Sequence, residues 1–158
     1  MRRRTKLLLA SSVLGLLIPI RANAIVIVGG FEGAGVQGTH GIIVNWHSSR
    51  AGTAGIIIVG GTPLAAPVEA SLSCAYFAPA PSTSATPVKV GGTFYGFGMG
   101  SDGHYYAVQA FDGGPGGADT VGIIIVGGQP SPTDPYCGAS AVPMSPFNGD
   151  VNGFIIYD

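Results

Sequence analysis

The sequence predicts an all-β domain, an antiparallel β-sandwich with a partly open barrel as the alternative arrangement. Short segments rich in β-branched and aromatic residues alternate along the chain with Gly, Pro, Ser and Asp. Beyond residue 24, no window carries apolar residues at helical spacing over three turns. The expected strands are Ile25–Val28, Ile42–Trp46, Ile56–Val59, Val68–Phe77, Val88–Phe97, His104–Phe111, Val121–Val126 and Phe154–Tyr157.

Residues 1–24 have the pattern of a bacterial signal peptide. Four basic residues among the first six precede the uncharged run Leu7–Ile20, and Ala22-Asn23-Ala24 then offers small side chains to a signal peptidase. The run of about 14 residues is short for a membrane-spanning helix, which needs roughly 20. We therefore expect a signal-peptide helix, cleavage, and export to the periplasm, the cell surface or the extracellular medium. The alternative is a short membrane anchor that stays attached, and either the Sec or the twin-arginine route is open.

Cleavage changes the charge of the chain. Five of the seven basic residues lie in the leader, so that only Arg50 and Lys89 remain. All eight acidic residues follow residue 24, which gives the mature chain a net charge of −6. Two basic side chains cannot neutralise a run of phosphates, so we expect no nucleic-acid binding and little attraction to anionic lipid. A cation is the charged partner that this balance favours.

The mature part, residues 25–158, has a suitable length for a single β domain. It contains a loop rich in Pro, Ser and Thr at residues 78–87. Cys74 and Cys137 are the only cysteines, and export takes them to an oxidising compartment, so we expect one disulfide across that loop. Two free thiols or a metal site are the alternatives, although the sequence lacks the spacing of a zinc site.

Three runs of Ile and Val, each followed by Gly-Gly, do not alternate with polar residues: Ile25–Val28, Ile56–Val59 and Ile123–Val126. A continuous apolar run indicates a strand that is buried on both faces, or one that leaves a face open for a partner. Because the runs lack charge and Pro, they are also the segments most prone to edge-to-edge pairing.

Two familiar motifs fail on their context. Ile27–Gly30 is similar to the mature N-terminus of trypsin-like proteases, but no Ser lies between Asp112 and the glycines that follow, so the nucleophile is missing. Gly33-x-Gly35-x-x-Gly38 and Gly98-x-Gly100-x-x-Gly103 match the dinucleotide-binding fingerprint as strings. That motif needs a helix directly after it, whereas strands are expected here, so both are interpreted as turns.

The histidines and the single tryptophan have ordinary interpretations. His40, His47 and His104 show no spacing typical of a zinc site, and we expect them on the surface or in loops. Trp46 is expected to anchor the core.

The most specific feature is the segment Asp112-Gly-Gly-Pro-Gly-Gly-Ala-Asp119, which joins two expected strands. Its glycines and proline predict a tight hairpin loop whose Asp side chains accept hydrogen bonds from backbone N–H groups. The alternative is a calcium site with Asp112, Asp119 and Asp102 as oxygen ligands. No other cofactor is expected.

The hairpin around this loop, Tyr105–Ile123, resembles the D-x-G-(E)-P-G-x-x-D-x-F-x-I hairpin of bacterial exported post-choice-of-anchor (post-COAP-like) β-sandwich modules. Val68–Cys74 resembles their cysteine-bearing strand. Their C-terminal cysteine and closing strand have counterparts in Cys137, Asn148–Val151 and Ile155–Asp158.

The resemblance covers residues 68–158, and the chain departs from the pattern at three points. It lacks the Glu before Pro115, it has Val121 in place of Phe, and it carries an insertion near Asn152. What the resemblance implies is a β-sandwich, an exported location and an accessory role without established catalytic activity.

We expect a non-catalytic exported protein with a structural or binding role toward an unknown ligand or surface component. The sequence pattern indicates no nucleophile–base pair and no catalytic carboxylate pair, so an enzyme is not expected. The main alternative is a self-associating fibre or matrix subunit that uses the Ile-rich runs for strand addition. An enzyme of unrecognised type is the third hypothesis.

Overall fold

The computed structural model describes residues 27–49, 52–62, 64–80, 88–89 and 91–155. The expected leader with its helix and most of the 78–87 loop lie outside these residues. The described residues include no helix long and apolar enough to cross a membrane.

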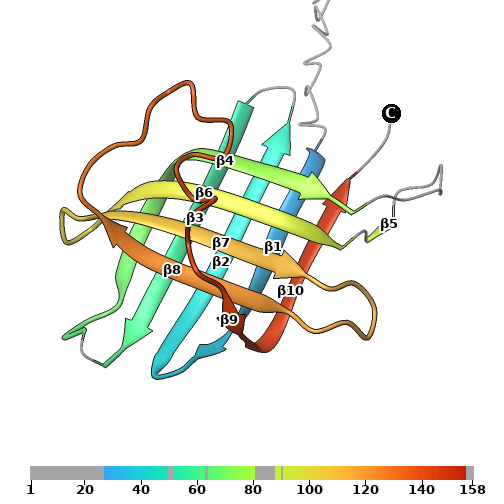
Figure 1. Ribbon diagram of the computed structural model, residues 1–158, viewed down its shortest axis with the longest axis horizontal. Coiled ribbons are helices and arrows are strands. Elements are labelled where there is room, and N and C mark those ends of the chain that lie inside the picture. Colours follow the sequence, from blue (N-terminus) through green and yellow to red (C-terminus); the bar gives the residue numbers. More distant parts are fainter. Residues whose placement is uncertain (1–26, 50–51, 63, 81–87, 90, 156–158) are drawn as a thin grey trace, which may run out of the picture.

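Ten strands form one antiparallel sheet that curls into a nearly closed barrel (Figure 1). The prediction of an all-β fold is confirmed. The arrangement is a nearly closed barrel, which was the alternative, and not the expected sandwich. A sandwich needs two separate sheets, whereas every strand here is hydrogen-bonded into one, in the order β5-β10-β1-β2-β3-β4-β6-β7-β8-β9. The strands are β1 (Ile27–Gln37), β2 (His40–Ser49), β3 (Gly52–Gly61), β4 (Val68–Pro79), β5 (Val88–Lys89), β6 (Gly92–Gly100), β7 (Tyr105–Asp112), β8 (Thr120–Val126), β9 (Ser145–Pro146) and β10 (Asn148–Ile155).

Strand β4 makes the corner at which the sheet folds over itself. Its first part, Val68–Ser71, pairs with β3, and residues Ala70–Pro79 pair with β6. Figure 1 shows the result: β4, β6, β7 and β8 cross in front of a second layer made of β3, β2, β1 and β10. The barrel thus has two layers, and β10 and β8 end up on either side of a seam that no backbone ladder closes.

A β-bulge between Leu72 and Cys74 lies in this corner strand. Successive side chains of a regular strand point to opposite faces, so residues 72 and 74 would normally share a face. The extra residue, Ser73, reverses the alternation. Leu72 therefore packs on the barrel core, whereas Cys74 packs on the outside.

Aromatic side chains fill the barrel interior. The rings of Phe31 and Phe94 stack with their centroids 5.0 Å apart, and Phe77 and Trp46 each lie 5.7 Å from one of them. Trp46 is only 5% exposed, which confirms its prediction as a core anchor. Alternate residues of β7 and β8, among them Val108 and Val121, complete this core.

A smaller core lies on the outer face of the front layer. The segment that follows β8 crosses this face and is tied to β4 by a disulfide between Cys74 and Cys137, whose Cα atoms lie 5.7 Å apart. The predicted disulfide is confirmed. Cys137, in this segment, packs on Phe97 of β6 and Ala107 of β7. Both strands therefore have buried side chains on both of their faces.

The glycine motifs interpreted as turns are mostly strand, and that prediction was wrong at four positions. Gly33 and Gly35 lie in β1, and Gly98 and Gly100 in β6; Gly38 and Gly103, with φ of 60° and 83°, do lie in turns. At Gly33 an added Cβ would lie 2.3 Å from the carbonyl oxygen of Asp150. The glycines let β10 approach β1 closely where the wall bends, so strand pairing here depends on the absence of side chains.

The Ile-rich runs occupy different places in the sheet. Ile56–Val59 lies in β3 between two paired strands, with Ile57 and Val59 buried inside the barrel. Ile123–Val126 lies in β8, where Ile123 packs on the barrel core and Ile124 on the outer core. A continuous apolar run in β8 therefore serves two faces, as expected from its pattern.

Candidate functional site

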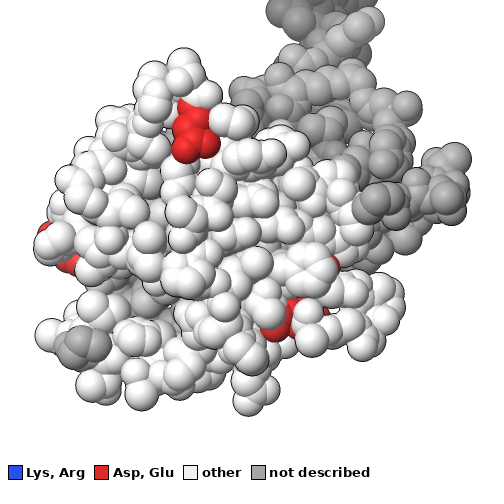
Figure 2. All heavy atoms as spheres, viewed as in Figure 1, with Lys and Arg blue, Asp and Glu red and all other residues white. Residues whose placement is uncertain are grey.

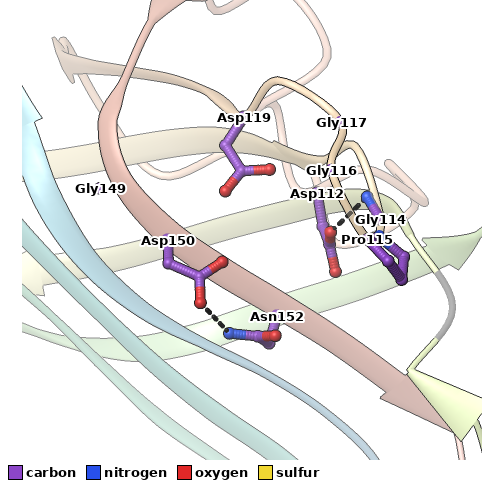
Figure 3. Close-up of a pocket in the computed structure, with 9 residues that line it drawn as sticks. All are labelled: Asp112, Gly114, Pro115, Gly116, Gly117, Asp119, Gly149, Asp150 and Asn152. Carbon is purple, nitrogen blue, oxygen red and sulfur yellow. Dashed lines mark hydrogen bonds between the residues drawn. The ribbon is translucent and has the colours of Figure 1, made fainter.

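The loop between β7 and β8, residues 113–119, lies at the seam beside β10 (Figure 3). The carboxylates of Asp112, just before the loop, and of Asp119, at its end, accept hydrogen bonds from backbone N–H groups within the loop and on β10. Asp112 is the last residue of β7 and follows the inward-facing positions of that strand, so its side chain is directed into the end of the barrel.

Asp112 is 5% exposed and is the one buried charged residue in the described part of the chain. Its Oδ1 accepts a hydrogen bond of 2.7 Å from the N–H of Gly114, and its Oδ2 accepts one of 2.6 Å from the N–H of Gly153 in β10. A buried carboxylate is costly unless hydrogen-bonded, and two backbone donors meet that need here.

Asp119 repeats the arrangement from the other end of the loop. Its Oδ1 accepts from the N–H of Gly113 at 3.0 Å, and its Oδ2 accepts from the N–H of Val151 in β10 at 3.0 Å. The carbonyl oxygen of Asp119 also accepts from the N–H of Phe147 at 3.2 Å. Each of the four carboxylate oxygens of the two residues thus receives one backbone donor, two from the loop and two from β10.

A third contact crosses the seam farther along β8. The side-chain amide of Gln37, at the end of β1, donates to the carbonyl oxygen of Val121 and to Oγ of Ser145, the latter at 2.5 Å. Side chains therefore connect the two layers where backbone pairing stops. The sequence analysis missed Gln37, because no local pattern marks a residue whose partners lie 84 and 108 positions away.

A hollow of about 350 Å³ lies between the loop and β10. Asp150 and Asn152 line its β10 side, and the Asn152 amide donates to Asp150 Oδ2 at 3.1 Å (Figure 3). Three carboxylates thus border one hollow, with Asp112 and Asp119 already engaged by the backbone. The described residues contain no group of three or more His, Cys, Asp or Glu arranged to hold a metal ion.

Asp102 lies at the far end of β7 from Asp112, and the structure does not bring the three expected calcium ligands together. Strand β7, eight residues long, separates the two, a span of roughly 25 Å. Asp102 Oδ2 accepts from the Tyr106 hydroxyl at 2.8 Å and lies 3.2 Å from Nδ1 of His104. The Tyr106 hydrogen bond lowers the pKa of Asp102, and burial, together with that hydrogen bond, raises the pKa of Tyr106 to about 12.

The histidines lie apart, at either end of β2 and in the β6–β7 turn. His40 borders a hollow beside β8, His47 contacts the ring of Phe154, and His104 is largely exposed. In the described part of the chain, no Ser, Thr or Cys side chain is hydrogen-bonded to a histidine, so these residues contain no assembled nucleophile–base pair.

Comparison with known proteins adds no further constraint. No family model, curated protein or solved structure matches this chain. The loop at the seam is accordingly interpreted from its own geometry, which is that of a clamp: two carboxylates hold the end of β7 and the start of β8 against β10.

Proposed function

We propose that this chain is an exported protein whose disulfide-bonded barrel has a structural or binding role and no catalytic one. One observation carries the proposal. The segment that the sequence singles out, residues 112–119, has its two carboxylates hydrogen-bonded to four backbone N–H groups, two in the loop and two on β10 across the seam.

Two further features support export. The leader pattern of residues 1–24 precedes the barrel, and the disulfide between Cys74 and Cys137 is a bond that persists in oxidising compartments. The proposed kinship of residues 68–158 with the post-choice-of-anchor modules implies the same location and the same accessory role.

To test export, the full-length chain is expressed with a C-terminal tag in a bacterial host, and the cytoplasm, periplasm, envelope and medium are separated. We expect the protein outside the cytoplasm, shortened by cleavage after Ala24, and with an intact mass two hydrogens below that of the reduced chain. Unprocessed protein that stays in the cytoplasm would contradict the export proposal.

The non-catalytic role needs a separate measurement. We expect the purified mature protein to turn over none of a panel of esterase, phosphatase and glycosidase substrates. Turnover by the wild type that an Asp112→Asn variant loses, while a folded barrel persists, would overturn this part of the proposal.

A self-associating subunit is the second candidate function, and the position of β8 favours it. Beyond Val121 the outer edge of this strand has no partner strand among the described residues. An uncovered edge rich in Ile is the kind of surface that pairs with another chain.

A further inference from the structure

The two edges of the sheet, at β10 and at β8, differ in how far their backbone groups have partners. On one side, β10 pairs with β5 through Phe154 and Ile155, and the N–H groups of Val151 and Gly153 are bound by carboxylates of the β7–β8 loop. Two outward donors of β10, the N–H groups of Val151 and Gly153, are thus engaged within the molecule. A second chain could not add to this edge without displacing those contacts.

The other edge, that of β8, is covered over only part of its length. Thr120 and Val121 pair with β9, but residues 122–126 have β7 as their one partner strand in the described chain. Outside the strand ladders, no backbone hydrogen bond among the described residues involves residues 122–126. Four of the five residues are Ile or Val, and neither charge nor Pro protects the strand, as usually happens at a natural sheet edge.

A hollow of about 220 Å³ lies beside this edge, between β8 and the turns at the ends of β1 and β3. Its lining is mainly apolar and includes Ile123, Ile125, Val59 and Leu64. Ile125 is 57% exposed, the most exposed large hydrophobic side chain of the described residues. A strand added to β8 would cover this hollow and bury Ile125.

The charges identify a second copy of this chain as a suitable partner. The mature chain carries eight acidic and two basic residues, so most contacts between two copies bring carboxylates together. Residues 120–128 and the lining of the hollow contain no carboxylate. Figure 2 shows the same uncharged character over much of this side of the molecule, where acidic side chains appear at only a few places.

We propose that the barrel forms a closed two-fold dimer through antiparallel pairing of β8 with β8 of a second copy. In the part of the chain that the structure describes, β8 has the one long stretch of strand without a partner on its outer side, so the same edge serves both partners and the contact is isologous. A head-to-tail fibre would need β10 as the second edge, and Asp112 and Asp119 bind its donors. This inference goes beyond the proposed function; its charge argument rests on removal of the leader, and it does not depend on the absence of catalysis.

The test uses the mature protein purified after export, with its disulfide intact. Light scattering after size exclusion and sedimentation velocity measure its mass over a range of concentrations. We expect a dimer for the wild type and a dissociation constant raised at least about tenfold by Ile125→Lys, because a charge on the edge strand opposes strand addition.

Met99→Lys is the matched control. Met99 is 56% exposed, almost the same as Ile125, but it lies on the outer face of the central strand β6. This variant should dimerise like the wild type, and circular dichroism and the intact disulfide report whether each variant is folded. A wild type that stays monomeric, a dimer unaffected by Ile125→Lys, or thioflavin-binding polymers would each overturn the proposal.

Discussion

Leu72 and Cys74 point to opposite faces of β4 although only one residue lies between them. Leu72 packs on the barrel core and Cys74 on the outer core, where it bonds to Cys137. The β-bulge at Ser73 makes this possible, and it lies where β4 leaves the back layer for the front one. The bulge thus lies at the corner of the barrel and lets Leu72 and Cys74 pack on opposite faces although Ser73 stands between them.

Deletion of Ser73 should leave the disulfide in place. Ser73 is the one residue of this stretch without a partner in β6, so its removal makes Leu72 and Cys74 neighbours in a regular strand, and Cys74 keeps its outward direction while Leu72 stays in the core. We expect no free thiol by reaction with a thiol reagent in denaturant, compared with two for the reduced protein. Ser73→Ala keeps the bulge and should also keep the bond. A deletion variant with two free thiols would show that the outward direction of Cys74 needs the bulge itself.

The clamp at the seam predicts unequal effects of three neutral substitutions. Asp112→Asn and Asp119→Asn each replace an accepting oxygen by an NH2 group that faces a backbone donor. We expect each to lower the free energy of unfolding by about 1–3 kcal/mol, with the larger loss at the buried Asp112. Urea unfolding followed by Trp46 fluorescence measures the loss.

Asp150→Asn is the control for this pair, because Asp150 borders the same hollow but is exposed. It should change stability by less than about 0.5 kcal/mol. Equal effects at all three positions would mean that the negative charge of the hollow, and not the backbone contacts, determines the stability.

Calcium should leave the melting temperature of the mature protein unchanged within about 1 °C, compared with the same protein in EDTA. A ligand that binds the folded state raises its stability in proportion to the logarithm of its concentration. Here Asp112 and Asp119 are engaged by the backbone and Asp102 lies at the other end of β7. A concentration-dependent rise that Asp150→Asn abolishes would instead assign a cation site to the hollow.

The pKa of Tyr106, raised to about 12 in the folded protein, predicts a loss of stability at high pH. Tyrosine ionises near pH 10 in the unfolded chain, so the stabilising effect is complete below pH 10 and is lost as the pH rises toward 12. Over this window the contribution of Tyr106 falls by about 1.4 kcal/mol per pH unit. Tyr106→Phe has no such ionisation, so the difference in unfolding free energy between the two proteins should shrink toward pH 12. A constant difference would contradict the raised pKa.

The sequence predicted the elements whose signal is local. Alternation and β-branched residues located parts of all eight long strands, and cysteine content with the leader predicted the disulfide. The prediction of turns in the glycine-rich stretch of β1 was wrong. Its glycines are required by the close approach of β10 and not by a local turn. The choice of a barrel over a sandwich depends on contacts between residues far apart in sequence.

In the candidate site too, the sequence predicted the local features and missed the contacts between residues far apart in the chain. The loop composition indicated that Asp112 and Asp119 would accept backbone donors, but half of those donors belong to β10, 41 and 32 residues away along the chain. Asp102 was grouped with them by residue type alone. No local pattern in the sequence reports that the eight residues of β7 place these two carboxylates at opposite ends of the barrel.

Strand β1 pairs along most of its length with β10, the last strand in the sheet by sequence. A chain synthesised from its N-terminus therefore cannot complete this wall until its final strand is available, and until then both β1 and the carboxylates of the β7–β8 loop lack their partners. Such late closure favours a slow, all-or-none folding step.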